Sequence, residues 1–330
     1  MFGERTTLEF RGDVHDRRRT LMTLSVPAGG LSLMANEATN ETTNDPTGSA
    51  PAPPMSQADR ARLFHSLHTG GTLLRLPNAW DAASARVVED AGAAAIATTS
   101  AGVAWSLGHA DGDQLPRHLA IGAVARVVAA VRVPVSADIE SGFAADAQGV
   151  AETIAGVIAA GAVGINLEDA SHGGAAPLRP VAEAAERVAA ARRAADAAGI
   201  PLYINARTDT YLLRVGEGEA RLRDTLARAE AYLAAGADGI FVPGVVQPHV
   251  VIELVQEIPA PLNILVGPGA PPIGVFADLG VARISVGSSI SLAAYALARR
   301  ATRELLDAGT YTELSGKLDY GELNALLTTP

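Results

Sequence analysis

The sequence predicts an α/β fold, a closed (β/α)8 TIM barrel, and three observations lead to this prediction. From Gly70 onward, short apolar runs alternate with Ala-rich helical segments, giving eight strand–helix units in about 240 residues. The strands are apolar on both faces, which is typical of a parallel sheet covered by helices. The glycine-rich dinucleotide-binding motif of an open, doubly wound sheet is missing after the first strand, where the chain reads Asn78–Ala79–Trp80–Asp81.

A recurring phrase locates the strands. Residues 91–100 (AGAAAIATTS), 160–169 (AGAVGINLED) and 235–244 (AGADGIFVPG) begin alike, and 279–288 (LGVARISVGS) is a close variant. Glycine is well suited to end a helix, and the apolar residues after it start a strand. Proline is tolerated at the first position of a strand and introduces three more runs. Together with 72–80 these make eight strands, the proline-led runs being 133–140, 200–209 and 260–267.

Helices are expected between these strands. Met55 opens the segment that we interpret as the first helix of the domain, with Ser56 as its N-cap and Leu63, Phe64 and Leu67 at helical spacing. The helices that follow the strands are expected at 81–91, 117–131, 146–160, 180–198, 218–235, 247–257, 272–279 and 289–307.

The first 54 residues have a different composition. Residues 36–54 are polar and rich in Pro and Thr, with almost nothing to bury. The arginines at 17–19 precede an apolar stretch, as in a secretory signal, but a proline and two glycines interrupt that stretch. We therefore expect a disordered extension over 1–54, or one created by an upstream start codon, then a barrel domain over 55–330 in a cytoplasmic protein.

The composition excludes several classes of chemistry. The 330 residues contain no cysteine, which excludes disulfides, thiolate metal sites and a cysteine nucleophile. Lys317 is the only lysine, so Schiff-base chemistry must use that residue or be absent. The net charge of −10 argues against nucleic acid as a partner. No run of about 18 apolar residues is present, so no membrane span is expected.

Acidic residues gather where the strands end, the end at which a (β/α)8 barrel carries its active site. Asp138 and Glu140 are two residues apart on one strand and face the same way, and Glu168 ends the next strand. Three carboxylates on one rim repel each other unless a cation lies between them, and carboxylates with water suit Mg²⁺ or Mn²⁺. The alternative is that these acids, with Asp111 and Asp113 in the loop after the second strand, are solvated or cap helices.

Arg207 and His172 are further candidates. Arg207 ends the fifth strand and could grip an anionic substrate, unless it forms a salt bridge with Glu168 or Asp209. His172 lies in a Gly-rich loop that could form a mobile lid, although a lone loop histidine is more often solvated. No paired-histidine spacing suggests zinc or iron.

Five motifs on successive strands resemble those of the isocitrate lyase and phosphoenolpyruvate mutase superfamily, especially its branch of phosphonomutase-like proteins. The resemblance covers roughly residues 56–325. It implies a barrel whose last helix is exchanged between subunits of a homodimer or homotetramer. It also implies Mg²⁺ and an enolate of an α-oxo acid such as pyruvate. The motifs are NAWDAASAR (78–86), TTSAGVAWSLGHADGD (98–113), SADIESGF (136–143), GINLED (164–169) and INARTD (204–209).

The resemblance also implies roles for single residues. Asp138 would be the main Mg²⁺ contact, and Glu140, Glu168 and Asp111 would complete the shell, mostly through water. The substrate carboxylate would be bound by backbone N–H groups of Thr99, Ser100 and Ala101, and a second anionic group by Arg207. We assign substrate binding to Asn205 as well, and catalysis to Asp111, Arg207 and His172.

The chain departs from this pattern in the loop after the fourth strand. Isocitrate and methylisocitrate lyases carry a Lys/Arg–Cys–Gly–His segment there, whose cysteine is the acid, and mutases and phosphonopyruvate hydrolases carry Lys or Asn. Residues 170–176 read ASHGGAA instead. Pro243 stands where the lyases have a substrate-binding glutamate, and Gly142–Phe143–Ala144 replaces a Gly-aromatic-Gly segment. An authentic isocitrate or methylisocitrate lyase is therefore not expected.

Four functions remain open. The first is a Mg²⁺-dependent lyase that cleaves a C–C bond of a small 2-hydroxy- or oxo-dicarboxylate. The second is C–P bond chemistry on phosphonopyruvate or carboxyphosphonoenolpyruvate. The third is a phosphate-binding barrel, because VGPG (266–269) and VGSS (286–289) follow the last two strands. The fourth is a non-catalytic protein that binds oxo acids.

Overall fold

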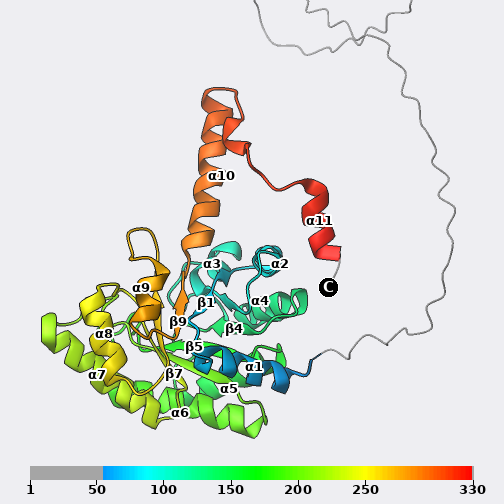
Figure 1. Cartoon of the computed structure of the whole chain (residues 1–330). Helices are drawn as coiled ribbons and strands as arrows, with labels where there is room; N and C mark the ends of the chain where they lie inside the picture. Colours follow the sequence, from blue (N-terminus) through cyan, green and yellow to red (C-terminus); the bar gives the residue numbers. More distant parts are fainter. Residues whose placement is uncertain (1–54, 329–330) are drawn as a thin grey trace, which may run out of the picture. The chain divides into compact units, whose positions relative to one another are not determined.

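The computed structural model describes residues 55–328, so the extension expected over 1–54 lies outside the described residues. Strands and helices alternate as in a TIM barrel (Figure 1). In the described part of the chain, no helix is long and apolar enough to cross a membrane. The strands are β1 (Leu74–Leu76), β2 (Asn78–Ala79), β3 (Ile96–Thr98), β4 (Val135–Asp138), β5 (Gly164–Glu168), β6 (Tyr203–Arg207), β7 (Gly239–Val242), β8 (Leu262–Leu265) and β9 (Arg283–Ser285).

The barrel closes through the first predicted strand, which is divided in two. All neighbouring strands are parallel, in the order β1-β9-β8-β7-β6-β5-β4-β3-β2. β1 pairs with β9, whereas β2 pairs with β3. Pro77 lies between the two halves and has no N–H to donate, although its carbonyl accepts from Ala97 N at 3.1 Å. The ring of strands is therefore complete except for a step at Pro77.

The expected helices are present, most of them within one residue of the predicted ends. Two of the repeated AGA phrases place Gly161 and Gly236 just after a helix, at φ of 90° and 101°, which only glycine adopts readily. The helices are α1 (Gln57–Thr69), α2 (Ala82–Asp90), α3 (Ser100–Ser106), α4 (Arg117–Ala130), α5 (Ala147–Ala159), α6 (Val181–Ala197), α7 (Gly218–Ala234), α8 (Pro248–Glu257), α9 (Ile273–Asp278), α10 (Ser289–Asp307), the 3-10 helix η1 (Thr312–Leu314) and α11 (Tyr320–Thr328).

Three elements differ from the prediction. α3 occupies the start of what was expected to be a long loop after the second strand, and η1 and α11 were not predicted. α10 has the predicted bounds but extends away from the barrel in Figure 1, and within it only Ser291 is buried. Its apolar side chains, including Leu292 and Tyr295, are largely exposed.

Four clusters of buried apolar side chains form the core of the described residues. The largest lies between the strands and the surrounding helices and contains, for example, Ile165 and Ile204. The second largest includes Phe64 of α1, and there Phe64 and His68 pack against Tyr203. The His68 ring stacks on Tyr203 with 3.9 Å between centroids, and burial, with the charge of Arg283, lowers the pKa of His68 to about 3. His68 is therefore an uncharged part of the core.

Candidate active site

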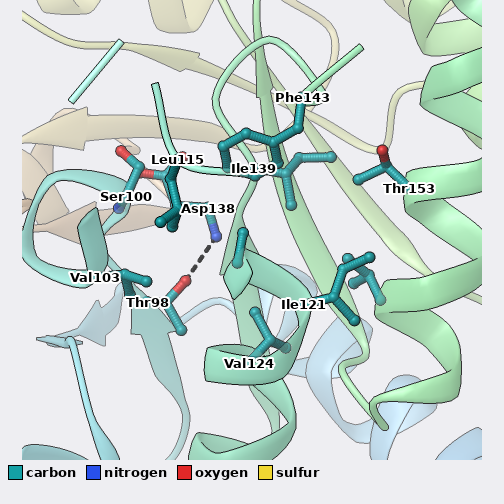
Figure 2. A pocket seen from close by; sticks show the side chains of 12 residues that line it. Thr98, Ser100, Val103, Leu115, Ile121, Val124, Asp138, Ile139, Phe143 and Thr153 are labelled. Atoms are coloured by element: carbon teal, nitrogen blue, oxygen red, sulfur yellow. Dashed lines mark hydrogen bonds between the residues drawn. The ribbon is translucent and has the colours of Figure 1, made fainter. Parts of the chain in front are cut away.

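Asp138 ends β4 at the mouth of the barrel, and its backbone and side chain are both held. Its N–H donates to Thr98 Oγ1 at 2.8 Å, and its Oδ2 accepts from Ser100 N at 3.2 Å. Figure 2 shows the small cavity beside it, which is lined mainly by apolar side chains of α3, α4 and α5 and of the loops between them. This burial raises the pKa of Asp138.

Glu140 follows β4 in a left-handed conformation, with φ of 51°, and is 2% exposed. Its Oε2 accepts hydrogen bonds from the backbone N–H groups of Gly112, at 2.9 Å, and of Asp113. Burial raises the pKa of Glu140 to about 8, and the charges of Asp111, Asp113 and Asp138 add to this effect, which the bond from Asp113 N opposes. Glu140 is therefore close to other carboxylates and is shielded from water.

Glu168 ends β5 and forms an ion pair with Arg207, the last residue of β6, at 2.7 Å. Arg207 also forms a bidentate pair with Asp209, at 2.6 and 2.9 Å. Burial raises the pKa of Glu168 to about 7 against the effect of Arg207. Burial also opposes the charge of Arg207, but the two carboxylates outweigh it and raise the pKa of that residue. Both salt bridges considered as the alternative role of Arg207 therefore exist.

A second network fixes Asp209. Its N–H donates to Asp169 Oδ1 at 2.9 Å, and Asp169 Oδ2 accepts from Tyr232 at 2.7 Å and from Arg228 at 3.1 Å. Asp169 is 1% exposed, so its carboxylate is buried among these partners. It anchors the partner of Arg207.

Two loops meet above the carboxylates. His172 Nε2 lies 3.0 Å from Glu168 Oε1, and this hydrogen bond raises the pKa of His172. The loop of His172 is closed at its base by a bridge between Ala170 and Leu178. A Cβ on Gly112 would lie 3.2 Å from His172 Nδ1, so the loop after α3 touches the His172 ring. Asp111, in that loop, is exposed.

The residues expected to bind substrate lie at two levels. Thr99, Ser100 and Ala101 are buried at the start of α3, next to Asp138, and Thr99 N donates to Ala79 O at 3.1 Å. Asn205 precedes Arg207 by two residues on β6, and its Nδ2 donates to Asn166 Oδ1 at 2.8 Å. The N–H groups of Thr99 and Ser100 are therefore already bonded within the protein, to Ala79 and Asp138, and Asn205 lies deeper in the barrel.

A hydrated divalent cation fits this donor set. Asp138 Oδ1 and Glu140 Oε1 are buried without a hydrogen-bond partner among residues 55–328. No three His, Cys, Asp or Glu side chains within that part of the chain lie close enough together to hold an ion directly. Mg²⁺ commonly keeps several waters and contacts only one or two carboxylates. The residues therefore suit an ion that is bound by Asp138 and reaches the other carboxylates through water.

Three residues that contact this site were not predicted from the sequence. Ser141 donates to Asp113 Oδ2, Arg179 donates to Ser141 Oγ at 3.1 Å, and Arg187 donates to backbone carbonyls of the same loop. Both arginines lie well away from the motifs in the sequence, and nothing local indicates their partners.

The family model described as phosphoenolpyruvate phosphomutase matches residues 64–306. A candidate phosphonomutase of Burkholderia cenocepacia is 47% identical, with a TM-score of 0.71 over 74% of this chain and 99% of its own. A candidate lyase/mutase from the same organism is 37% identical, with a TM-score of 0.77 over 83% and 97%. An uncharacterized protein of Mycobacterium tuberculosis is 39% identical over 80% of this chain and 95% of its own.

Proposed function

Because the chain belongs to the phosphoenolpyruvate phosphomutase family, we propose that it is a divalent-metal-dependent lyase. It would cleave a C–C bond of a small 2-hydroxy- or oxo-dicarboxylate and release a pyruvate-type product through its enolate. The observation that carries this proposal is the pair of buried, unpartnered carboxylate oxygens on Asp138 and Glu140 at the mouth of the barrel. Such oxygens are costly to bury unless a cation accompanies them.

The carboxylates would bind the metal ion, and the start of α3 would bind the substrate. Asp138, with Glu140 and Glu168 through water, would hold Mg²⁺ or Mn²⁺. A bound ion would supply positive charge that stabilises the oxygens of the developing enolate. At the start of α3 the N–H groups of Thr99 and Ser100 donate to Ala79 and Asp138, so the backbone N–H of Ala101 would orient the substrate carboxylate.

Arg207 and His172 would act on the other side of the substrate. Asp209 holds two nitrogens of Arg207, so the guanidinium is fixed before an anionic group arrives. His172 has a raised pKa and part of its side chain, 31%, is exposed. Because the hydrogen bond to Glu168 favours its charged form, His172 would be the group that donates a proton to the enolate carbon, a role for which this chain has no cysteine. Asp111, in the neighbouring loop after α3, would assist this proton transfer.

The second candidate is C–P chemistry on a phosphonate, such as phosphonopyruvate. The loop at 170–178 lacks the cysteine of the methylisocitrate lyases, and a 47% identical protein is a candidate phosphonomutase. A phosphate-binding barrel is less well supported, because Asn78 Oδ1 already accepts from the N–H groups of Val286, at 3.0 Å, and Gly287, at 2.9 Å. Those are groups that a phosphate would need.

A substrate screen tests the proposal. The protein would be incubated with Mg²⁺ and 2-methylisocitrate, dimethylmalate, oxaloacetate or phosphonopyruvate, with release of oxo acid and of phosphate measured separately. We expect turnover of a carboxylate substrate that EDTA abolishes and that Asp138→Asn reduces at least a hundredfold, while the exposed Glu152→Gln leaves it unchanged. Phosphate release alone would favour the second candidate. Binding of Mg²⁺ and oxalate without turnover of any substrate would favour a non-catalytic protein.

We also propose that the protein is a homodimer or homotetramer in which α10 is exchanged between subunits. In a barrel, the helix after the last strand ordinarily covers the outer face of the last and first strands. Here α10 leaves that face, and an apolar groove of about 830 Å³ remains, lined by residues that include Leu73, Ile284 and Ile290. Exposed apolar side chains on α10 are suited to fill the same groove of a second subunit.

A further inference from the structure

We propose that Arg187, a buried arginine on α6, is a positioning residue that fixes the loop after β4 and thereby the place of Glu140. The inference deepens the proposed function, because it concerns how the candidate metal site is held. Arg187 belongs to neither the strands nor the loops that carry the site, and it acts through backbone carbonyls.

The loop after β4 has an unfavourable backbone. Glu140 and Phe143 adopt positive φ values of 51° and 49°, although neither is glycine. Gly142 lies between them with φ of 104°, and a Cβ there would lie 2.8 Å from Val150 Cγ2. A backbone of this kind persists only where its surroundings hold it in place. The position of Glu140 therefore depends on contacts outside the loop.

Arg187 provides such contacts. Its Nη1 donates to Ser141 O at 3.0 Å and Ala144 O at 3.1 Å, and its Nη2 donates to Ala145 O at 2.6 Å. All three acceptors belong to this one loop: Ser141 precedes the left-handed pair Gly142 and Phe143, and Ala144 and Ala145 follow it. The planar guanidinium can reach several acceptors at fixed angles, which an ammonium group cannot do.

The burial of Arg187 has no comparable explanation as an ion pair. The residue is 1% exposed, and the nearest carboxylate oxygen, Glu183 Oε1, is 3.5 Å from its Nε. Glu183 is 43% exposed and lies closer to Arg179, at 2.8 Å. Burial accordingly lowers the pKa of Arg187. An apolar side chain would fill such a position at lower cost, so the directional bonds to the loop are what the arginine contributes.

The same loop is fastened to the one that caps Glu140. Ser141 donates to Asp113 Oδ2, and the N–H groups of Asp113 and Gly112 donate to Glu140 Oε2. Moving Ser141 would therefore shift Glu140 through its own backbone and also through the amides that orient its carboxylate. Arg187 binds the carbonyl of Ser141, so replacing Arg187 should disturb both the backbone position of Glu140 and the amides that bind its carboxylate.

Arg187→Met tests the inference, with Arg192→Met as a control on the same helix. Arg192 binds the carbonyls of Gly236 at 3.0 Å and Leu202 at 3.1 Å and pairs with Asp238, but it has no partner in the loop after β4. Two readouts are needed: hydrogen exchange of the amides in residues 139–146 of the metal-free protein, and Mn²⁺ affinity measured by electron paramagnetic resonance. Circular dichroism would check that each variant folds.

We expect Arg187→Met to speed exchange in 139–146 at least tenfold and to weaken Mn²⁺ binding at least tenfold, with neither change in Arg192→Met. For Arg187→Lys we expect an exchange rate and a Mn²⁺ affinity between those of the wild type and of Arg187→Met. If Arg187→Met does not fold, Arg187→Lys takes its place in the test. Exchange and Mn²⁺ affinity equal to those of the wild type would overturn the inference. If the wild type itself binds no Mn²⁺, the proposed metal site is wrong, and the exchange measurement alone decides the role of Arg187.

Discussion

Replacing Glu140 with glutamine should stabilise the metal-free protein and at the same time weaken its metal binding. Burial raises the pKa of Glu140 from 4.5 to about 8. Between these values the folded chain holds a proton that the unfolded chain has released, so stability falls as the pH rises. Each pKa unit corresponds to about 1.4 kcal/mol, so the ionised carboxylate costs about 5 kcal/mol above pH 8 and about 3 kcal/mol at pH 7.

Glutamine has the shape of glutamate and can still accept from the N–H groups of Gly112 and Asp113, but it carries no charge. Urea unfolding in EDTA should therefore show Glu140→Gln more stable than the wild type by about 5 kcal/mol at pH 9 and by under about 1 kcal/mol at pH 5. Glu152→Gln, at an exposed surface pair, should change stability by no more than about 0.5 kcal/mol.

Added Mn²⁺ should raise the stability of the wild type, because a ligand that binds only the folded state stabilises it, and should raise that of Glu140→Gln much less. The reasoning is refuted if Glu140→Gln is no more stable than the wild type at pH 9 without metal, since burial of the charge would then carry no cost.

Three further predictions concern the barrel and its assembly. His68 stays uncharged down to about pH 3, whereas an unfolded histidine takes up a proton below about pH 6.5. As the pH falls from 6.5, the free energy of unfolding of the wild type should therefore decrease by about 1.4 kcal/mol per pH unit relative to that of His68→Phe. Urea unfolding at a series of pH values measures this, and an equal pH dependence in the two proteins would contradict it. Gly142→Ala should destabilise by more than about 1 kcal/mol in thermal unfolding because of its positive φ and the contact with Val150, whereas Gly122→Ala, in open space on α4, should stabilise by up to about 1 kcal/mol. Leu292→Glu, on the exposed face of α10, should convert the oligomer to monomers in sedimentation experiments, and a monomeric wild type would refute helix exchange.

The parts of this protein that depend on local sequence were predictable. The repeated AGA phrases carry both the helix stop and the start of a strand, and the proline-led runs mark further strands, so the eight units and the acidic residues at the strand ends follow from the two signals together. α3 was not predicted because its sequence, SAGVAWS, is short, contains Gly102 and has no side-chain cap at Thr99.

The contacts that hold the site residues in position could not be predicted from local sequence. A backbone carbonyl has no sequence signature, so the contacts of Arg187 could not be anticipated from an arginine on an Ala-rich helix. For Arg207 the sequence left open whether the residue binds an anionic substrate or forms a salt bridge. In the structure it pairs with both Glu168 and Asp209 and still lies at the end of β6, at the mouth of the barrel.

The pairing of the first strand with the last has a consequence for the synthesis of the chain. Asn78 accepts a hydrogen bond from Gly287, 209 residues later, and β1 pairs with β9 across a similar separation. During synthesis the growing sheet therefore presents an unpaired edge to the cell until β9 has left the ribosome. The nascent chain is most exposed to aggregation in that interval, and the last strand to be translated ends it by joining the first.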